Sequence, residues 1–142
     1  MKFAERLSPL GLTPPHAGIL WALSSSGGSS QQSLAEHLGV LPSRLVALVD
    51  ELESRGLVER RDNPEDRRSH ALHLTEDGRS TLEAIGRTVR AHQESLCEAL
   101  TATELEQLAA LLFRIAEQQG LRRGVHPGFG RLGRARTRAA ER

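Results

Sequence analysis

Four arginines fall within one short stretch of the chain, at Arg60, Arg61, Arg67 and Arg68. Guanidinium groups bind phosphate oxygens and base edges through paired hydrogen bonds, so a cluster of this kind favours a nucleic-acid partner. Catalytic groups do not gather in the same way: the sequence has no nucleophile–base pair, phosphate-binding loop or pair of carboxylates in a supporting context. We therefore expect a binding protein and no enzymatic activity.

The cysteine and histidine residues are placed unfavourably for metal or redox chemistry. The single cysteine, Cys97, excludes an internal disulfide and a C-x-x-C motif, and its spacing from neighbouring leucines fits a half-buried helix position better than a redox sensor. None of the six histidines has the i, i+4 spacing of helical metal ligands, and His70 and His73, in a predicted strand, point to opposite faces. The sequence thus predicts no metal site and no cofactor.

The net charge of +1 over 142 residues conceals two segments of opposite sign. Residues 120–142 hold seven arginines against one acid, a charge of +6, while residues 1–119 hold 12 basic and 17 acidic residues, a charge of −5. Five glycines in the C-terminal segment predict a disordered basic tail, which either contacts flanking phosphates or has no role. Because no apolar run is long enough to span a membrane, we expect a soluble cytoplasmic protein.

Capping residues and apolar periodicity divide the first half of the chain into helices. Thr13 is predicted to cap one helix, the stretch 24–30 to form a flexible loop, and Ser30 to cap a second helix that Gly39 ends. A longer helix follows from Ser43, and its apolar positions have the i, i+3, i+4, i+7 rhythm of one buried face. These positions are Leu45, Leu48, Val49 and Leu52.

Two predicted strands, 57–61 and 69–74, flank a charged turn at 62–68. Helix, turn, helix and a two-stranded hairpin with a basic tip together make a winged helix, with a helical bundle carrying an incidental hairpin as the alternative. The predicted fold class is mainly α with a small β-wing, a winged helix-turn-helix domain joined to a helical dimerisation region.

The same segments resemble the multiple-antibiotic-resistance regulator (MarR) family over residues 8–119. The motifs that carry the resemblance lie at 10–13, 34–39, 45–58, 63–68 and 74–78. The resemblance implies a dimeric winged-helix transcription regulator, usually a repressor and often released from DNA by small molecules. One departure is the first helix, which is usually longer in the family than residues 1–7 allow, so that it is either shortened or vestigial here.

The long helix is expected to enter the major groove with Ser43, Arg44 and Ala47 nearest the bases, because such helices read DNA with their N-terminal residues. Arg44 can pair with guanine or neutralise a phosphate. Compared with the resembling family, Ala47, Val46 and Glu51 replace groove-facing polar or basic residues. We therefore expect base specificity to depend on methyl contacts and DNA shape, and we interpret Glu51 as a sign of altered docking.

The wing supplies the positive charge that this helix lacks. We predict DNA contacts from Arg60, Arg61, Arg67 and Arg68, because a wing tip can place an arginine in a narrow minor groove. By the resemblance, Asp66-x-Arg68 matches the wing motif of the family, in which the arginine enters the minor groove and Asp66 stabilises the wing. A solvated turn with weak surface ion pairs is the alternative.

Two leucine-rich helices are predicted after the wing, opened by Thr75 and by a Thr103-x-x-Glu106 capping box. Their apolar positions exceed what one winged domain buries, which predicts an isologous homodimer, with a larger monomeric core as the alternative. The expected layout is a helical dimerisation region at 1–23 and 76–119, a winged helix-turn-helix region at 24–75, and the tail at 120–142.

By the resemblance, a small-molecule effector would bind between the dimerisation helices and the winged domain, near His16, Leu20 and Trp21, although residues of these types are more often part of the core. Two functions stay open. The first is a homodimeric DNA-binding transcription regulator, a repressor of a palindromic operator in double-stranded DNA that an effector can release. The second is a winged-helix module for protein–protein contact, favoured by the acidic body and the few basic residues of the long helix.

Overall fold

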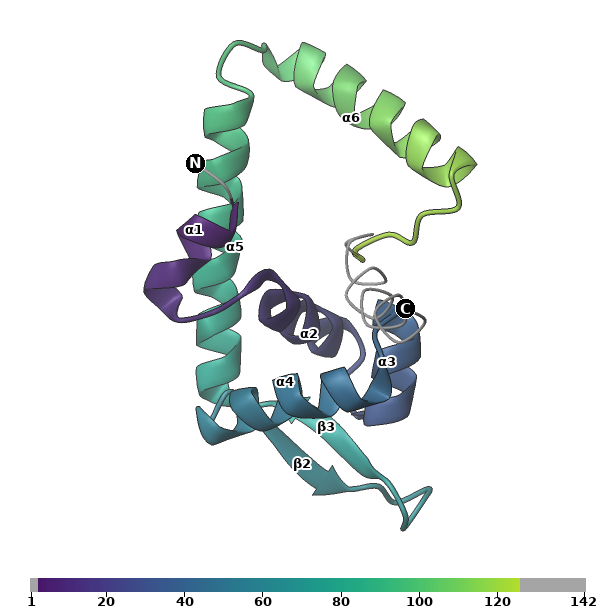
Figure 1. The fold of residues 1–142 in the computed structure, drawn as a ribbon. Helices are drawn as coiled ribbons and strands as arrows, with labels where there is room; N and C mark the ends of the chain where they lie inside the picture. The colour runs from purple at the N-terminus through teal and green to yellow at the C-terminus, as the bar shows by residue number, and fades with distance from the viewer. Residues whose placement is uncertain (1–2, 126–142) are drawn as a thin grey trace, which may run out of the picture.

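The computed structural model describes residues 3–125, which form six α-helices, one short 3-10 helix and a three-stranded sheet (Figure 1). In chain order the elements are α1 (Phe3–Leu7), the 3-10 helix (Ser8–Leu10), α2 (Pro14–Ser25), β1 (Ser29–Ser30), α3 (Gln31–Leu38), α4 (Pro42–Ser54), β2 (Val58–Asp62), β3 (His70–Leu74), α5 (Glu76–Leu96) and α6 (Ala102–Gln118). The predicted fold class, mainly α with a small β-wing, is confirmed. Within the described range, no helix is both long and apolar enough to cross a membrane.

Local contacts begin α3 and α5, and end α3, where the sequence predicts. Ser30 Oγ accepts the Ser33 amide at 3.1 Å at the start of α3, and Thr75 Oγ1 accepts the Gly78 amide at 3.0 Å at the start of α5. Gly39 ends α3 with a φ of +67°, a left-handed conformation that glycine adopts without strain. The short turn after Gly39 leads into α4 and completes a helix-turn-helix.

The predicted flexible loop at 24–30 is wrong in part. The helix α2 continues to Ser25, and Ser29 and Ser30 form β1, which pairs antiparallel with Leu72 and Ala71 of β3. The two serines of β1 show no alternation of apolar and polar residues that would predict a strand. Pairing with β3 is what makes this segment a strand.

The predicted start of the last helix is also wrong, by two residues. The capping box consists of Thr101 and Glu104: the Thr101 amide donates to Glu104 Oε2 at 2.8 Å, and the Glu104 amide donates to Thr101 Oγ1 at 3.3 Å. The first of these bonds lowers the pKa of Glu104, because it stabilises the charged carboxylate. Thr103 and Glu106 therefore lie inside α6 rather than at its start.

The sheet has the order β1-β3-β2, and β2 with β3 forms the wing hairpin, in which Val58 pairs with Leu74 and Asp62 with His70. The helix α5 begins directly against the start of this hairpin. A Cβ atom at Gly78 would lie 2.0 Å from the carbonyl oxygen of Leu57, so only glycine permits the approach.

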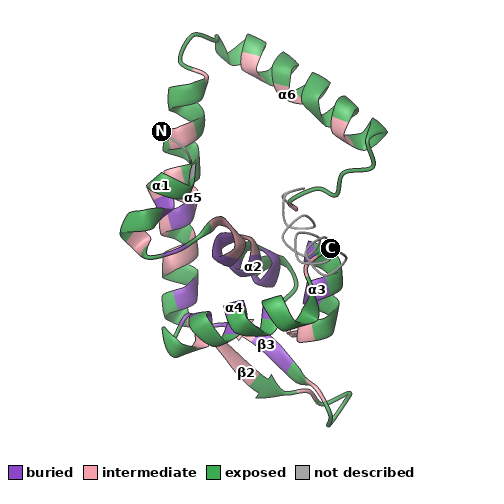
Figure 2. Cartoon of the chain, viewed as in Figure 1, coloured by how far each residue is buried: buried purple, intermediate pink, exposed green. Residues whose placement is uncertain are grey.

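The core lies between α2, α3, α4 and the sheet, with contributions from α1 and α5 (Figure 2). Its fully buried large side chains are Leu7, Ile19, Leu20, Leu34, Leu45, Leu52, Leu72, Val49 and Val58. The helix α2 packs against α3, α4 and β3 as well as against α5, so it contacts both predicted regions.

The helix α6 contributes no buried residue, and in Figure 1 it leaves the end of α5 and stands apart from the winged core. One stripe on its surface is apolar and 39–56% exposed, formed by Leu108, Leu111, Leu112 and Ile115. The surplus of apolar surface that the sequence predicts is thus present and uncovered in a single chain.

After α6 the chain returns to α3. The Arg122 guanidinium donates to the carbonyl oxygens of Glu36 and His37, at 2.9 and 3.2 Å, and Val125 packs against the core. Arg122 therefore provides hydrogen-bond donors for carbonyl groups in the last turn of α3. These contacts order the start of the segment predicted as a disordered tail, and the remainder, 126–142, lies outside the described residues.

Candidate nucleic-acid interface

The helix α4 presents its N-terminal turn to solvent. Its four predicted apolar positions are buried, whereas Ser43, Arg44 and Ala47 are exposed on the opposite side. Leu41 precedes the helix and Pro42 begins it, and within residues 3–125 the amides of Ser43 and Arg44 have no side-chain cap. Such amides, together with the positive end of the helix dipole, can bind a phosphate.

The turn of the wing is held by side-chain-to-backbone hydrogen bonds. Asp66 Oδ1 accepts the Arg68 amide at 2.9 Å, and Asn63 Oδ1 accepts the Glu65 amide at 3.0 Å. Asn63 Nδ2 also donates to Ser69 Oγ at 3.2 Å across the turn. The Asp66 carboxylate thus orders the backbone from which the Arg68 side chain extends.

The arginines of this surface fall into a free and a paired group. The guanidinium groups of Arg44, Arg67 and Arg68 are exposed, and within residues 3–125 they make no hydrogen bond or ion pair. Arg61 is also exposed, but its guanidinium is bound to the neighbouring Glu59 carboxylate. Positive charge available to a polyanion is therefore concentrated at the start of α4 and at the wing tip.

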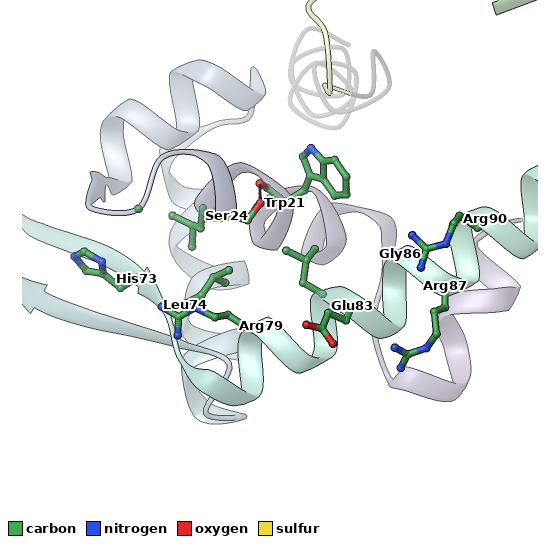
Figure 3. A pocket seen from close by; sticks show the side chains of 12 residues that line it. Trp21, Ser24, His73, Leu74, Arg79, Glu83, Gly86, Arg87 and Arg90 are labelled. Carbon is green, nitrogen blue, oxygen red and sulfur yellow. Dashed lines mark hydrogen bonds between the residues drawn. The ribbon is translucent and has the colours of Figure 1, made fainter. Parts of the chain in front are cut away.

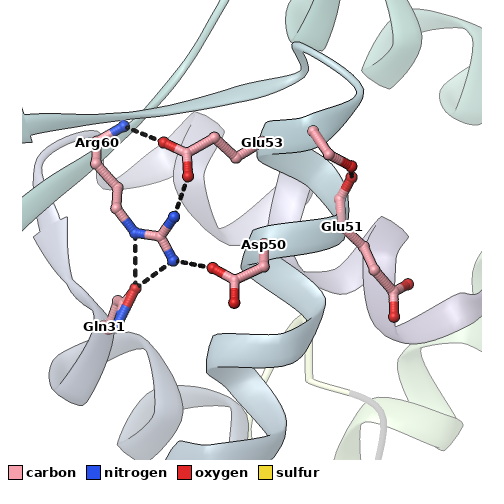
Figure 4. A network of polar contacts seen from close by, with 6 residues as sticks. Gln31, Asp50, Glu51, Glu53 and Arg60 are labelled. Atoms are coloured by element: carbon pink, nitrogen blue, oxygen red, sulfur yellow. Dashed lines mark hydrogen bonds and ion pairs between the residues drawn. The ribbon is translucent and has the colours of Figure 1, made fainter.

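Arg60 has partners within the protein that the sequence does not predict. Its guanidinium binds Asp50 at 2.5 Å, Glu53, and Gln31 Oε1 at 2.9 Å, and its side chain is only 20% exposed (Figure 4). Arg60 thus joins β2 to α3 and α4, and its single positive charge offsets part of the negative charge of Asp50 and Glu53. The geometry supports a structural role at this junction, and the DNA contact of Arg60 stays a prediction.

Replacing Arg60 by methionine should lower the free energy of unfolding by about 1–2 kcal/mol, because it removes the hydrogen bonds of a largely buried guanidinium to the Gln31 amide and to two carboxylates. Urea denaturation measures this change. The control is Arg61→Met, which breaks only an exposed ion pair and should change stability by less than about 0.5 kcal/mol. Equal effects of the two substitutions would contradict the assignment of Arg60 to the junction.

The third acid of α4, Glu51, points away from this network toward α2 (Figure 4). Its Oε2 atom lies 2.8 Å from Nε2 of His16, whose Nδ1 accepts the Thr13 amide at 3.2 Å. Glu51, predicted from the sequence to indicate altered docking on DNA, has its carboxylate engaged within the protein. Burial lowers the pKa of His16, although the bond to Glu51 opposes this shift.

Because the folded state lowers the pKa of His16 below its ordinary value of 6.5, the unfolded chain binds more protons in the interval just below that value. The contribution of neutral His16 to stability is therefore present above pH 6.5 and is lost as the pH falls. Unfolding free energies measured from pH 7.5 to 5.5 should decrease more steeply for the wild type than for His16→Gln, whose side chain does not titrate. Parallel curves would refute this prediction.

The predicted effector residues His16, Leu20 and Trp21 are not brought together. Leu20 is fully buried in the core, and His16 faces α4. Trp21 is 54% exposed and lines a hollow of about 720 Å³ between α2, β3 and α5 (Figure 3). Of the three predicted residues, Trp21 is the one that lines this hollow.

The sequence alone does not predict the charged lining of this hollow. Arg79, Arg87 and Arg90 of α5 border it, with Glu83 as the acidic member and His73 on the β3 side. Within residues 3–125, the Arg87 and Arg90 guanidinium groups make no hydrogen bond or ion pair. Their helical spacing was visible in the sequence, but it is equally typical of a solvated helix face.

Cys97 follows α5 as a half-buried free thiol. No group of three His, Cys, Asp or Glu side chains in the part of the chain that the structure describes is arranged to hold a metal ion.

Comparison with known proteins places this architecture in a family. A model of the MarR family matches residues 10–69. A putative transcriptional regulatory protein for the hcr operon of Thauera aromatica is 34% identical over 76% of this chain, which spans 65% of that relative's length.

Solved structures resemble the fold over more of the chain. Wild-type MarR from E. coli, in its apo form, has a TM-score of 0.74 and 30% identity, covering 80% of this chain and 84% of that one. The transcriptional repressor CouR, bound to a 23-mer DNA duplex, has a TM-score of 0.71 and 38% identity, covering 80% and 81%. Because the chain shares this winged-helix architecture and a substantial part of its sequence with these proteins, it belongs to the MarR family of DNA-binding transcription regulators.

Proposed function

We propose that this chain is a homodimeric repressor that binds a palindromic operator through the N-terminal turn of α4 and the wing. The distribution of paired and free charge carries the proposal. All three acids of α4, Asp50, Glu51 and Glu53, are engaged by side chains of the protein. The free guanidinium groups lie at the two features that a winged helix presents to DNA.

Each residue of this surface has a proposed role. Ser43, Arg44 and Ala47 face the major groove, where Arg44 pairs with a base or a phosphate. Arg68 enters the minor groove, Arg67 neutralises a phosphate, and Asp66 keeps the wing turn in shape. Arg61 contributes little, because Glu59 already neutralises it. No catalytic step is part of this proposal.

The apolar stripe of α6 supports the dimer. Exposed leucine and isoleucine side chains along a helix without buried residues favour self-association through an isologous interface. Two copies related by a two-fold axis would present two α4 helices to successive major grooves, which a palindromic site requires.

Fluorescence anisotropy with the DNA upstream of the coding sequence tests the proposal. A duplex that contains an inverted repeat should bind two chains with an affinity at least about 10³-fold above that of a scrambled duplex. Equal affinities for the two duplexes would contradict DNA-sequence recognition and would favour the alternative of a protein–protein interaction module.

We also propose that the hollow beside Trp21 binds a small anionic effector with a flat aromatic body. Two unpaired guanidinium groups supply charge-assisted hydrogen bonds, and the exposed indole supplies a stacking surface. The hollow lies between α2 and β3 of the winged core and α5, the helix that leads to α6. A ligand there could change the spacing of the two DNA-binding helices in a dimer.

Benzoate should quench the fluorescence of Trp21, the only tryptophan, more strongly than the neutral analogue benzyl alcohol at equal concentration. The double variant Arg87→Gln, Arg90→Gln should weaken benzoate binding roughly tenfold or more, because it removes charge-assisted bonds to the carboxylate. Arg114→Gln, on α6, is the control and should leave benzoate binding unchanged. Equal binding of benzoate and benzyl alcohol would refute an anion site.

A further inference from the structure

The helix α4 is tied to α2 by a polar contact that the proposed DNA contacts do not explain. Glu51 Oε2 lies 2.8 Å from His16 Nε2. The histidine is only 6% exposed, whereas the Glu51 side chain is 60% exposed. The contact therefore joins the buried His16 ring to a side chain on the exposed surface of α4.

The imidazole ring is fixed at both of its nitrogens. Nδ1 accepts the Thr13 amide at 3.2 Å and lies 2.9 Å from Thr13 Oγ1. Because a backbone amide can only donate, Nδ1 carries no proton, so the neutral ring carries its proton on Nε2 and donates it to Glu51. The N-terminus of α2 thus sets the direction in which this donor points.

The position of Glu51 on α4 connects this bond to the groove-facing residues. Ala47 precedes Glu51 by four residues and Arg44 precedes it by seven, so all three lie along one side of the helix. A rotation of α4 that separates Glu51 from His16 also turns Arg44 and Ala47. The packed apolar residues on the buried face restrict the rotation of α4, and the hydrogen bond, which depends on angle as well as distance, adds a constraint at the exposed flank of the helix.

We propose that His16 and Glu51 are positioning residues for sequence recognition: their hydrogen bond sets the rotation of α4 about its axis and therefore the direction of Arg44 and Ala47 in the major groove. This inference rests on the proposed function. It assigns to Glu51 a contribution to operator specificity, even though its negative charge repels DNA phosphates.

Two substitutions separate this role from electrostatics. Glu51→Gln and Glu51→Ala both remove the negative charge, but only glutamine keeps an oxygen that accepts the His16 proton. Kd values are measured at fixed salt for the operator duplex and for a scrambled duplex, and their ratio gives the specificity. Glu51→Ala should lower this ratio on the order of tenfold, and Glu51→Gln should stay within about twofold of the wild type.

The control pair is Glu36→Ala and Glu36→Gln on the exposed face of α3, which should leave the ratio unchanged. Thermal melting checks that each variant is folded at the assay temperature, which excludes unfolding as the cause of a changed ratio of Kd values. Equal ratios for Glu51→Ala and Glu51→Gln overturn the positioning role while the proposed function stands. A wild type that does not distinguish the operator from the scrambled duplex overturns the proposed function, and this inference with it.

Discussion

Replacing Arg68 by alanine should weaken operator binding by at least about tenfold at fixed salt and leave the protein folded. The guanidinium is exposed and unpaired within residues 3–125, whereas the wing turn is held through the backbone amide of this residue. Alanine keeps that amide and its bond to Asp66, so the substitution removes the DNA contact without removing the turn. Fluorescence anisotropy gives the affinity, and thermal melting checks the fold.

Arg61→Ala is the matched control for this experiment. It removes the same charge from the same hairpin, but the Arg61 guanidinium is already bound to Glu59. Its effect on affinity should be less than about threefold, in the range of an exposed ion pair. If Arg68→Ala leaves the operator affinity unchanged, the wing does not contribute to DNA binding.

Replacing Ile115 by glutamate should convert the dimer to a monomer and reduce operator affinity by roughly 100-fold or more. Ile115 lies in the exposed apolar stripe of α6 and is 56% exposed in the single chain. A carboxylate there would have to be desolvated in a dimer interface, and a monomer can no longer bind the second half-site. Size-exclusion chromatography with light scattering measures the mass, and anisotropy measures the binding.

Ala110→Glu introduces the same side chain on the other side of α6 and should leave both mass and affinity as in the wild type. An Ile115→Glu variant that remains dimeric would place the interface elsewhere. A variant that is monomeric and binds the operator with full affinity would contradict the need for two half-sites.

The elements that were predictable from the sequence are those that local interactions define. Ser30, Gly39 and Thr75 mark helix ends through contacts with residues a few positions away, and these contacts are present. The buried face of α4 follows from apolar spacing alone. At α6, two overlapping patterns, Thr101-x-x-Glu104 and Thr103-x-x-Glu106, satisfy the same local rule, and only the structure selects the first.

The parts of the site that sequence reasoning missed depend on contacts between distant residues. In the sequence Arg60 is one of four arginines predicted to contact DNA from the wing, and nothing there shows that Asp50, Glu53 and Gln31 converge on it. The partners His16 and Glu51 are 35 residues apart in the chain. No rule of periodicity or spacing connects such pairs, because the fold itself brings them together.

These pairings also bear on the net negative charge of residues 1–119. A charge of −5 over residues 1–119 argues against a DNA partner only if the acids of α4 face the phosphates unopposed. Arg60 offsets part of the charge of Asp50 and Glu53, and His16 holds the Glu51 carboxylate, which keeps its charge, by a hydrogen bond. What remains available to DNA at this surface is the unpaired group of Arg44, Arg67 and Arg68.

The dependence of operator affinity on salt tests most directly whether these three arginines face the DNA. The wild type and the triple variant Arg44→Gln, Arg67→Gln, Arg68→Gln are compared by plotting log affinity against log salt concentration. The slope of the variant should be shallower by roughly 0.9 for each phosphate that the variant no longer neutralises, or at most about 5 for a dimer. Identical slopes and affinities for the two proteins would contradict the account.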